Sequence, residues 1–370
     1  MNAQRRIKPR ELARMRGDDV PQRPTGTVLV TVVIPSFNYA RFLELAVDSA
    51  LGQEGVDVEV IIVDDASTDG SEQLAREFVD RDPRVRLIVH HENLGPVATF
   101  NDGLDAAHGE YLIRLDADDL LTPGAAARAS ALAERFPNVG MVYGHPVHFS
   151  DEDPPGRYRN RATSWDVMSG SSWLELRCRL GVNCITSPEV LMRTSLLRHI
   201  GGQRALAHTH DMELWFRLAR HADVGWLGGC DQAWHREHPD SLSARQVTVM
   251  TDFEERAQAF RTLFTDGLGD PVVDRLMLRT ALNALANEAV ARASSAYAKG
   301  RGGSPETDGY LRFARSLGVD LGTLPHARAL RAAQRLGRKR APFSPYLFAH
   351  AARYRLTREL GKPRWRSRGL

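Results

Sequence analysis

Apolar, largely β-branched runs alternate with amphipathic stretches up to residue 143, and this alternation limits the possible folds more than any other feature of the chain. Residues 27–34 (TVLVTVVI) and 58–63 (VEVIIV) are typical of strands that are covered on both faces. The alternation predicts an α/β fold in which a largely parallel sheet carries helices on both faces. Further strands are predicted at 85–89, 111–115 and 139–143, with helices from residue 42 to 50 and over 74–79, 97–107 and 122–136.

The pattern beyond residue 143 is less regular. Residues 144–172 are rich in His, Asp, Pro, Gly and Arg, which predicts an irregular loop. Apolar residues at three- and four-residue spacing predict helices over 211–222, 253–264 and 273–297. A short strand at 189–192, a small helix ending at Gly201, and strands at 224–226 and around Trp234 complete the prediction.

These patterns divide the chain of 370 residues into four predicted parts. Residues 1–26 form a polar N-terminal leader, and residues 27–246 form the domain that contains the predicted sheet. A helical C-terminal region follows at 247–324, and residues 325–370 form a basic helical tail.

Composition predicts a cytoplasmic protein. The N-terminus lacks the apolar core of a secretory signal, and no apolar run approaches the length of a membrane-spanning helix. The three cysteines, Cys178, Cys184 and Cys230, show no paired spacing of the kind found in zinc sites or disulfide frameworks. This usage fits a reducing compartment.

Charge is distributed unevenly, although the net charge is only +3. From Pro325 onwards there are thirteen Arg and Lys and one acid, or about +12, and residues 1–23 carry about +4. The segment between them is therefore acidic, at about −13. This asymmetry favours a metal-dependent site with an end that meets an anionic surface or partner, and it does not favour specific nucleic-acid binding.

Three carboxylates within four residues follow the predicted strand at 111–115, in the sequence Asp116-Ala117-Asp118-Asp119. Their mutual repulsion is relieved by a hard divalent cation, Mg²⁺ or Mn²⁺, which binds oxygen ligands and shares them with substrate phosphates. The alternative is an exposed turn with capping aspartates before the next helix. Because ligands bind at the carboxyl ends of parallel strands, the position favours the metal site.

Three other polar clusters are candidates for function. The segment Asp64-Asp65 to Gly70 can accept hydrogen bonds from a nucleotide base or ribose, or it can form a turn and a helix cap. Asp211, after His208 and His210, can cap the helix that follows or act as the general base that deprotonates a sugar hydroxyl. In the segment 235–241, Arg236 or His238 can meet a diphosphate, although a solvated polar loop is the alternative. For the pair His145 and His148, ordinary polar roles are favoured over metal binding.

The ordered motifs resemble those of the family 2 glycosyltransferases, which have the GT-A fold. The resemblance is carried by VVIPSFN at 32–38, IIVDDASTDG at 61–70, Asn93-Leu94-Gly95, and Gly109-Glu110-Tyr111 leading into the acidic cluster at 116–119. It is dense from residue 28 to 123 and weaker at 189–202, 211–218 and 238–241. It implies a Rossmann-like GT-A sheet and inversion at the anomeric carbon in a single displacement. The helical C-terminal region that the periodicity predicts follows this sheet.

The resemblance also implies roles for individual residues. Asp211 would be the catalytic base, and Asp118 and His238 would hold Mn²⁺ or Mg²⁺. Asp116 would face the ribose side. Nucleotide-sugar binding would fall to Pro35, Phe37, Asn38, Asp65, Asn93, Gly95, Asn101, Asp116 and Ala117.

Two departures from the family pattern affect these expectations. Many members carry an Arg-Asn pair where this chain has Phe100-Asn101, and the acidic residue that usually precedes the base is His210 here. The Gln-x-x-Arg-Trp element of processive synthases is absent from the sequence. We therefore expect one sugar to be added per encounter.

UDP is the favoured nucleotide by this resemblance, with dTDP and GDP open, and the acceptor is a saccharide, a lipid-linked molecule or a small molecule. The alternatives are a non-catalytic nucleotide-sugar-binding subunit and a sugar-phosphate nucleotidyltransferase. The latter requires a Gly-rich phosphate loop after the first strand, where this chain has Pro35-Ser36-Phe37-Asn38.

The basic tail can bind an anionic membrane surface, or it can pack on the acidic body or form a dimer contact. For membrane binding, the expected apolar face consists of Tyr346, Leu347, Phe348 and Tyr354.

Overall fold

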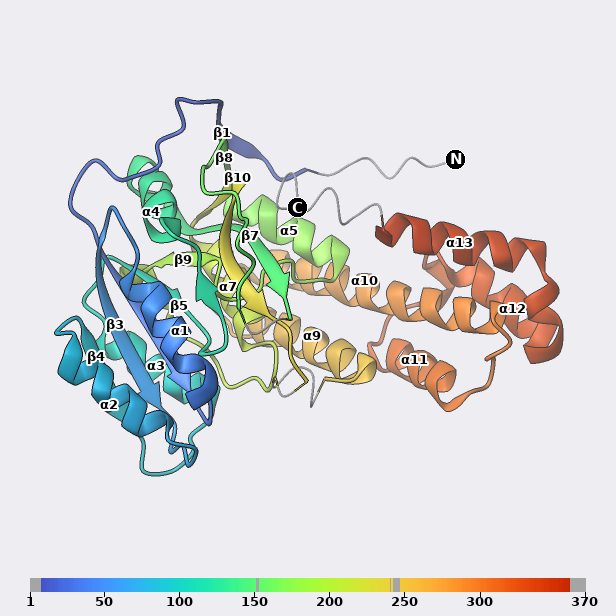
Figure 1. Ribbon diagram of the computed structural model, residues 1–370. Coiled ribbons are helices and arrows are strands. Elements are labelled where there is room, and N and C mark those ends of the chain that lie inside the picture. The colour runs from blue at the N-terminus through green and yellow to red at the C-terminus, as the bar shows by residue number, and fades with distance from the viewer. Residues whose placement is uncertain (1–7, 151–152, 240, 242–246, 360–370) are drawn as a thin grey trace. The chain divides into compact units, whose positions relative to one another are not determined.

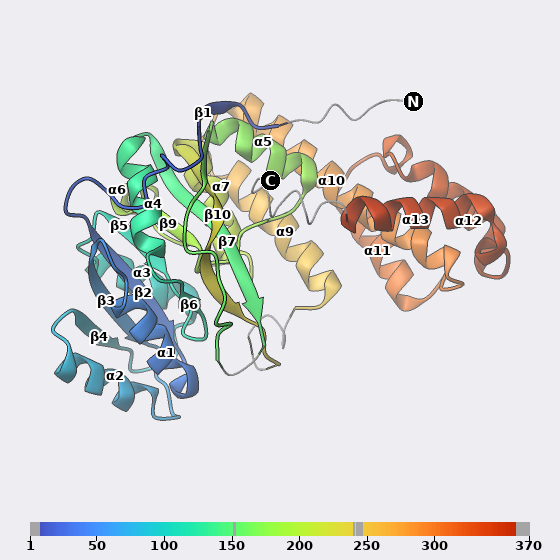
Figure 2. The ribbon, with the colours of Figure 1, turned by 45° about the horizontal axis from the view of Figure 1, so that its top comes forward.

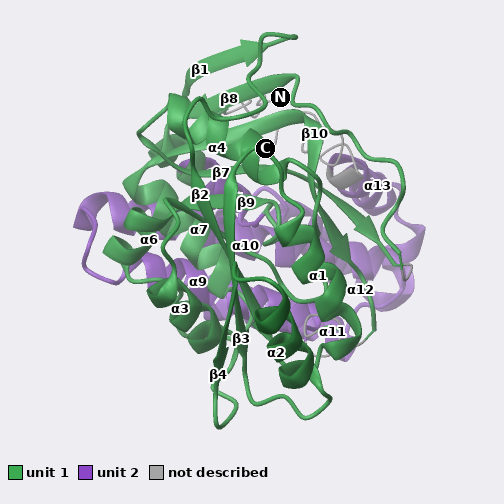
Figure 3. Cartoon of the chain, turned by 60° about the vertical axis from the view of Figure 1, so that its left-hand side comes forward, with its two compact units in different colours: residues 1–174, 184–245, 367–369 green, residues 175–183, 246–366, 370 purple. Residues whose placement is uncertain are grey.

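The computed structural model describes residues 8–150, 153–239, 241 and 247–359, and these separate into two compact units (Figure 3). One unit contains the described residues of Met1–Leu174 and Cys184–Arg245. The other contains those of Glu175–Asn183 and Gln246–Arg366. The four-part division predicted from the sequence stays a proposal, and the ends of its leader and tail lie outside the described residues.

The first unit is built on one mixed sheet, whose strands lie in the order β1-β8-β10-β7-β9-β5-β2-β3-β4, with β6 paired to β10. Strands β4, β3, β2, β5, β7, β10 and β1 run in one direction, while β9, β8 and β6 run in the other. The bounds are β1 Glu11–Arg16, β2 Leu29–Ser36, β3 Asp57–Asp64, β4 Val85–Val89, β5 Tyr111–Arg114, β6 Leu120–Leu121, β7 Val139–Phe149, β8 Ser164–Met168, β9 Val190–Arg193 and β10 Asp223–Arg236.

Helices cover both faces of this sheet, as the sequence predicts (Figures 1 and 2). Helix α1 (Ala40–Leu51) packs against α2 (Ser71–Arg81), β2 and β3, and α4 (Ala125–Arg135) packs on β7 and β10. Helix α3 (Pro96–Ala106) packs on β2 and β3, and α6 (Thr194–Ile200) contacts both α3 and α7 (His210–His221).

The central strands are apolar because both of their faces are buried. In β2, Val30, Val32, Val33 and Ile34 have no exposed surface, and Val60, Ile61, Ile62 and Val63 of β3 are equally buried. Such strands read as continuous apolar runs, whereas strands with one solvated face alternate. The mostly parallel α/β architecture predicted from these runs is confirmed.

One prediction of local structure is wrong, and another is correct but incomplete. Residues 144–172 are not an irregular loop, because β7 continues to Phe149, β8 occupies Ser164–Met168, and α5 begins at Gly170 and ends at Leu180. The strands predicted at 224–226 and around Trp234 are a single strand, β10, whose register against β7 shifts between Trp226 and Asp231. Gly229, with φ of 85°, lies at this irregularity.

The segment predicted as a polar leader contributes strand β1, which pairs antiparallel with β8 at the edge of the sheet. Arg14 and Arg16 of this strand both contact the Asp166 carboxylate.

The second unit is helical. Its elements are α9 (Val249–Phe264), α10 (Pro271–Ala298), α11 (Pro305–Ser316), η1 (Leu321–Thr323), α12 (Ala327–Arg340), η2 (Ala341–Phe343) and α13 (Pro345–Glu359). Helix α10 contacts α9, α11, α12 and α13, so it forms the centre of this unit. Among the described residues, no helix combines the length and apolarity needed to cross a membrane.

Candidate active site

The polar motifs meet at the carboxyl edge of the sheet, by which we mean the end where its parallel strands finish. They meet there because the strands that precede them run in the same direction. Strands β2, β3 and β10 end at Ser36, Asp64 and Arg236, and the acidic cluster follows the end of β5. The backbone is unusual at the same edge: Asn38 and Ala66 have φ values of 58° and 61°. The left-handed region is uncommon for residues other than glycine, and such conformations cluster at functional sites.

Asp118 and His238 lie together at this edge, although 120 residues separate them in the chain. The Nε2 atom of His238 is 2.9 Å from the Asp118 Oδ2 atom, and both side chains are largely buried. The Phe42 ring packs at 5.0 Å from the His238 ring, centroid to centroid. Sequence reasoning predicted this pair as metal ligands, and the structure brings the two side chains within reach of one another.

The donor atoms of this pair fit a cation such as Mn²⁺ or Mg²⁺, which takes few protein ligands and completes its shell with phosphate and water oxygens. Within the described part of the chain, no three His, Cys, Asp or Glu side chains gather around one possible ion position. A cation held by Asp118 and His238 would therefore depend on substrate oxygens for the rest of its coordination.

Asp119 turns away from that pair into the protein. Its Oδ2 lies 3.0 Å from Nδ1 of His235, and its Oδ1 accepts a hydrogen bond from the Arg236 backbone N–H at 2.8 Å. Burial raises the pKa of Asp119 to about 7. Burial lowers the pKa of His235, but the carboxylates of Asp119, Glu189 and Asp118 together outweigh this and raise it to about 9. These contacts attach the acidic cluster to the end of β10.

Asp116 is held by an arginine from the preceding strand. The Arg114 guanidinium contacts the Asp116 Oδ1 atom at 2.8 Å and donates a hydrogen bond to Oε1 of Gln203 at 3.1 Å. It lies 5.8 Å from the centroid of the Phe100 ring. The resemblance in sequence implies an arginine at the position of Phe100, and Arg114 supplies a guanidinium beside that position from another element.

Asn101 is engaged within the protein. Its side-chain amide donates to the Gln203 carbonyl at 2.9 Å, and its Oδ1 atom accepts from the Gln203 N–H at 2.8 Å. To contact a nucleotide sugar as predicted, Asn101 would therefore have to give up its hydrogen bonds to Gln203. In the structure as described, Asn101 fixes the loop that carries Gln203 to Arg114.

Asp211 stands in the first turn of α7, close enough to Arg114 and Asp116 for both to influence its pKa. Its Oδ1 accepts a hydrogen bond from the Met212 N–H at 2.6 Å. Burial raises the pKa of Asp211 to about 6, and burial lowers the pKa of the neighbouring His210 to about 3. At neutral pH, an uncharged histidine therefore precedes a carboxylate that is more basic than an ordinary aspartate.

Asp65 organises the loop after β4. Its Oδ1 accepts from the Leu94 N–H at 2.8 Å, and its Oδ2 accepts from the Gly95 N–H at 2.9 Å. His90 bridges Asp65 and Asp102, with contacts of 2.7 and 2.9 Å. Both carboxylate oxygens of Asp65 are thus occupied by protein donors, so a direct contact with the nucleotide base would compete with them.

Asp64, next to Asp65, has only one of its two carboxylate oxygens hydrogen-bonded in the described chain. Its Oδ1 accepts from the Ser67 N–H at 2.9 Å, but its fully buried Oδ2 has no hydrogen-bond partner in the described chain. The Ser36 hydroxyl, which is the register partner of Asp64 across β2 and β3, is likewise buried without one. Unpaired buried polar groups are costly, so they mark this strand end as a place that a polar ligand or water can complete.

The other predicted residues surround this edge. Phe37 is 43% exposed just after β2, Pro35 is partly buried in that strand, and Ala117 is buried within the acidic cluster. Asn38 accepts from the Thr68 N–H at 2.8 Å and so joins the loops after β2 and β3. Asn93 is exposed. Gly95 helps to line a cavity of about 300 Å³ between residues 94–97 and 205–207.

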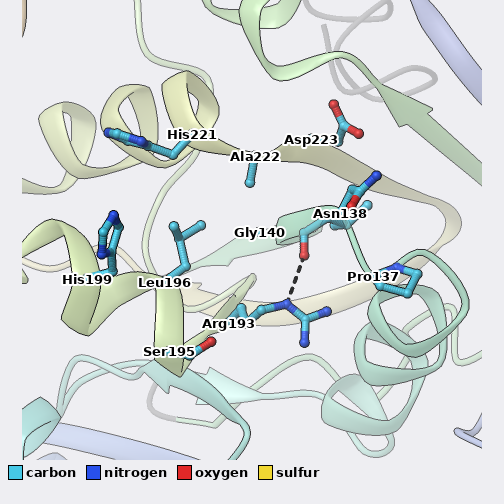
Figure 4. Close-up of a pocket in the computed structure, with 11 residues that line it drawn as sticks. Pro137, Asn138, Gly140, Arg193, Ser195, Leu196, His199, His221, Ala222 and Asp223 are labelled. Carbon is cyan, nitrogen blue, oxygen red and sulfur yellow. Dashed lines mark hydrogen bonds between the residues drawn. The ribbon is translucent and has the colours of Figure 1, made fainter. Parts of the chain in front are cut away.

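A larger cavity, of about 500 Å³, lies at the opposite edge of the sheet, where β7 and β10 begin (Figure 4). Its lining includes Gly140, Arg193, His199, His221 and Asp223. It contains none of the acidic motifs, and we assign it no part in the chemistry proposed below.

A buried ion pair in α7 supports the loop behind the site. The side chains of Glu213 and Arg217 are fully buried, and they meet at 2.8 Å. Arg217 also donates to the Ile200 and Gly202 carbonyls, and Arg204 contacts Glu213 at 3.1 Å. The pair therefore fixes residues 200–204, which include Gln203.

We predict that Arg217→Met lowers the free energy of unfolding by about 3–5 kcal/mol, because it leaves the Glu213 carboxylate buried without its principal partner. Urea denaturation followed by circular dichroism measures this loss. The double variant with Glu213→Leu should recover part of it, since the uncompensated charge is then gone. A single variant as stable as the parent would contradict a structural role for the pair.

Several residues at this edge were not identified from the sequence as functional candidates, and they all lie next to candidates that were. A sequence signal for Arg114 did exist, because it is a charged residue inside an apolar strand and lies two residues before Asp116. His235 was visible only as part of a polar segment, and nothing local distinguished His90 or Gln203. For the pair His145 and His148, the structure shows a separate carboxylate for each: His145 lies 3.1 Å from Asp231 and His148 lies 3.0 Å from Glu237.

Comparison with known sequences finds related glycosyltransferases. The sequence model of the family described as glycosyl transferase family 2 matches residues 31–201. The succinoglycan biosynthesis protein ExoO of Rhizobium meliloti (strain 1021) is 45% identical over 94 residues, 25% of this chain and 26% of that protein. An uncharacterised glycosyltransferase of Rickettsia typhi, RT0329, is 27% identical over 211 residues, 54% of this chain and 61% of that protein. The matches span only 26%, 35% and 37% of the first three curated relatives.

Solved structures share the fold over most of their length. Staphylococcus aureus TarS (residues 1–349), solved in complex with UDP-GlcNAc, superposes with a TM-score of 0.56 at 16% identity, covering 89% of this chain and 92% of that one. The mannosyltransferase PcManGT of Pyrobaculum calidifontis, in complex with GDP-Man and Mn²⁺, gives 0.51 at 20% identity, covering 90% and 89%. The fold predicted from the sequence, GT-A with a helical C-terminal region, is confirmed. Residues 31–201 match the family 2 model, so this part of the chain is a glycosyltransferase domain of that family.

Proposed function

We propose that this chain is an inverting glycosyltransferase that moves a single sugar from a nucleotide-diphosphate sugar to an acceptor hydroxyl. The observation that carries the proposal is the pairing of Asp118 with His238 at 2.9 Å, at the same edge of the sheet as Asp116 and Asp211. This edge combines groups that can hold a cation with a basic carboxylate, as a metal-assisted displacement requires. UDP is the favoured nucleotide, and neighbours bound to UDP-GlcNAc and GDP-Man support a nucleotide-sugar donor.

Asp118 and His238 would hold Mn²⁺ or Mg²⁺, and a neighbour that contains Mn²⁺ supports this choice. When bound, the cation would neutralise charge on the diphosphate leaving group. The chain itself would keep Asp118 in place through Arg236, whose Nε donates to the Asp118 carbonyl at 3.0 Å. Asp119, fixed by His235, would prevent the cluster from shifting.

Asp211 would act as the general base. The acceptor hydroxyl oxygen forms a bond to the anomeric carbon, and the bond from that carbon to the diphosphate oxygen breaks. The hydroxyl proton passes to the Asp211 carboxylate, while the diphosphate leaves with the electron pair. One displacement of this kind inverts the anomeric centre. The hydrogen bond from the Met212 N–H would orient the carboxylate.

Donor recognition would be shared among the loops at the same edge. Pro35, Phe37 and Asn38 follow β2 and would line the base together with Asp65. Asn93, Gly95 and Asn101, with Asp116 and Ala117, would complete the nucleotide-sugar site. Arg114, held between Asp116 and Gln203, would supply the positive charge that the family motif places at the position of Phe100.

The acceptor would be a saccharide, a lipid-linked molecule or a small molecule, and similarity to ExoO supports a place in the assembly of a polysaccharide or glycoconjugate. We also propose a cytoplasmic location. No disulfide joins Cys178, Cys184 and Cys230, all of which the structure describes, and this agrees with a reducing compartment.

A transfer assay tests the proposed reaction. The purified chain is incubated with α-linked UDP-, GDP- and dTDP-sugars and a panel of acceptors, with Mn²⁺ or with EDTA. We expect metal-dependent release of one nucleoside diphosphate and, by NMR, a β-linked product. A product that retained the α configuration would contradict the single displacement. Metal-dependent nucleotide binding without turnover on any acceptor would favour the alternative of a non-catalytic binding subunit.

We predict that transfer depends on pH with an apparent pKa of about 6, the value that burial gives Asp211. The base must be ionised to accept a proton, so kcat should fall up to about tenfold per pH unit below 6 and level off above it. A pH–rate profile at saturating donor measures this, and donor binding measured over the same range serves as the control. A level rate down to pH 5 would remove Asp211 from this role.

A further inference from the structure

The second unit contains a segment of unusual composition. Residues 321–357 include eight arginines and lysines and no aspartate or glutamate. In the structure this segment forms η1 and a hairpin of two helices, α12 and α13, joined by η2 (Figures 1 and 2). We call residues 327–357 the basic hairpin, and residues 336–348, where the chain turns, its tip.

The basic hairpin is held together by its own small core. Ala329, Ala333, Ala341 and Leu347 are buried with one another and pack against Tyr297 and Ala298 at the end of α10. Away from the tip, Nδ1 of His326 lies 2.8 Å from Nε2 of His350. These contacts position the tip, so the side chains exposed on it are presented by an ordered element.

The cations of the basic hairpin are exposed. Within the described chain, none of the eight forms an ion pair or hydrogen bond with a carboxylate. Arg328, Arg331 and Arg335 recur at three- and four-residue spacing, which places them on one face of α12. The other five are Arg338, Lys339, Arg340, Arg353 and Arg355.

Large apolar side chains project among these cations. Phe343 is 86% exposed and Phe348 is 72% exposed, while Tyr346 and Leu356 are 52% and 58% exposed. Two of the residues expected from the sequence to form an apolar face do not belong to it. Leu347 is fully buried in the hairpin core, and Tyr354 is partly buried against His326.

We propose that the basic hairpin binds the surface of an anionic phospholipid membrane, with Phe343 and Phe348 entering the headgroup region. Clustered Arg and Lys are attracted to anionic headgroups, and bulky apolar side chains add affinity when they leave water at the interface. The two features occur on one element, and the absence of any acid means that nothing within residues 321–357 opposes the attraction. The proposal does not depend on the proposed sugar transfer.

A lipid surface fits these features better than the other anionic partners. A nucleic acid would use the cations and stack on aromatic rings, but it has little use for an exposed aliphatic residue such as Leu356. A second copy of this chain would bring eight further cations to the contact. A membrane accommodates apolar and cationic side chains together, since the rings enter the interface while the charged ends stay among the phosphates.

The test is flotation of the full chain with vesicles of equal parts phosphatidylglycerol and phosphatidylcholine, compared with vesicles of phosphatidylcholine alone. We expect binding to the anionic vesicles only, weakened by salt. Each Arg or Lys near an anionic surface contributes about fivefold to the partition coefficient. The double variant Arg338→Gln with Arg340→Gln removes two charges, so it should lower the partition coefficient by roughly 25-fold. Phe343→Ser with Phe348→Ser should lower it by at least roughly tenfold.

Matched controls come from α10 and the turn before it, which also expose cations and aliphatic residues. Arg275→Gln with Arg279→Gln removes the same charge, and Leu268→Ser with Leu276→Ser removes comparable exposed apolar surface. Neither control should change vesicle binding. All variants should keep the parent's circular dichroism and its nucleotide affinity, so failure at the membrane is distinguishable from failure of the donor site.

Three results would overturn the proposal. Equal partition of the parent into neutral and anionic vesicles would exclude recognition of lipid charge. Binding to anionic vesicles that both hairpin variants retain would exclude the hairpin as the contact. A parent that binds single-stranded RNA in preference to vesicles, or that is a dimer dissociated by the phenylalanine substitutions, would assign the surface to a nucleic acid or to a second copy.

Discussion

Replacing Asp211 with asparagine is expected to lower kcat for sugar transfer by about 10²- to 10⁴-fold, the usual contribution of a general base. The amide oxygen of asparagine can still accept the hydrogen bond that the Met212 N–H gives to Asp211, so α7 should keep its N-terminal geometry. The amide cannot accept the acceptor's proton. Single-turnover transfer with excess enzyme measures the chemical step, and titration with the free nucleoside diphosphate should show little change in affinity.

Asp105→Asn is the matched control for this variant, because Asp105 is an exposed acid near the end of α3, away from the carboxyl edge of the sheet. It should transfer sugar at the parent's rate. If Asp211→Asn also kept near-normal turnover with a true acceptor, Asp211 would be a helix cap and the base would have to be found among other residues of this edge.

Asp118→Asn has the second large effect that we expect, and it acts on binding. The substitution removes the carboxylate that contacts His238 in the described part of the chain, so the two side chains no longer offer an anionic site for a cation. The affinity for the nucleoside diphosphate in the presence of Mn²⁺ should fall by at least roughly 100-fold, because even the loss of a group that only orients a metal ligand costs about 10- to 100-fold. Affinity measured in EDTA should be unchanged, because only the metal-dependent part is lost.

His238→Gln provides a second test of the same pair. It should lose metal-dependent affinity as well, and adding it to Asp118→Asn should cost little more, since residues that act as one unit are not additive. Asp105→Asn again serves as the control. If Asp118→Asn kept the full enhancement by Mn²⁺, the cation would have to be held elsewhere or not used.

The sequence predicted the central sheet well because each strand carries its own signal. Strands β2 and β3 are buried on both faces, and burial on both faces produces a continuous apolar run that needs no knowledge of neighbours. The same signal located the strand ends, and with them the edge where Asp116, Asp118 and His238 meet. The individual roles of these residues remain predictions.

The sequence failed where structure depends on distant partners. Strand β8 forms because Ser164–Met168 pairs with both β10 and β1. The sequence of those five residues does not predict either pairing. The sequence predicts two strands in place of β10, because Gly228 and Gly229 interrupt the apolar pattern. In the structure the hydrogen-bonded ladder continues past these two glycines. The misplacement of Leu347 has the same cause, since only the fold of the hairpin buries it.

Supporting residues were hidden for a related reason. The position of Arg114 is set by its contacts with Gln203 and Phe100, which lie on a loop and a helix elsewhere in the sequence. His90 becomes part of the site only because Asp65 and Asp102 flank it in space. A motif identifies the groups that meet a ligand, whereas the groups that hold them in place are recognised only after the chain is folded.

The central claim is that residues at the carboxyl edge of the sheet bind a nucleotide-sugar donor with a divalent cation. Calorimetric titration of the full chain with UDP, GDP and dTDP, each with and without Mn²⁺, tests it most directly. The account predicts that one nucleotide, UDP by preference, binds tightly when Mn²⁺ is present and much more weakly without it. Failure of all three nucleotides to bind under either condition would contradict it.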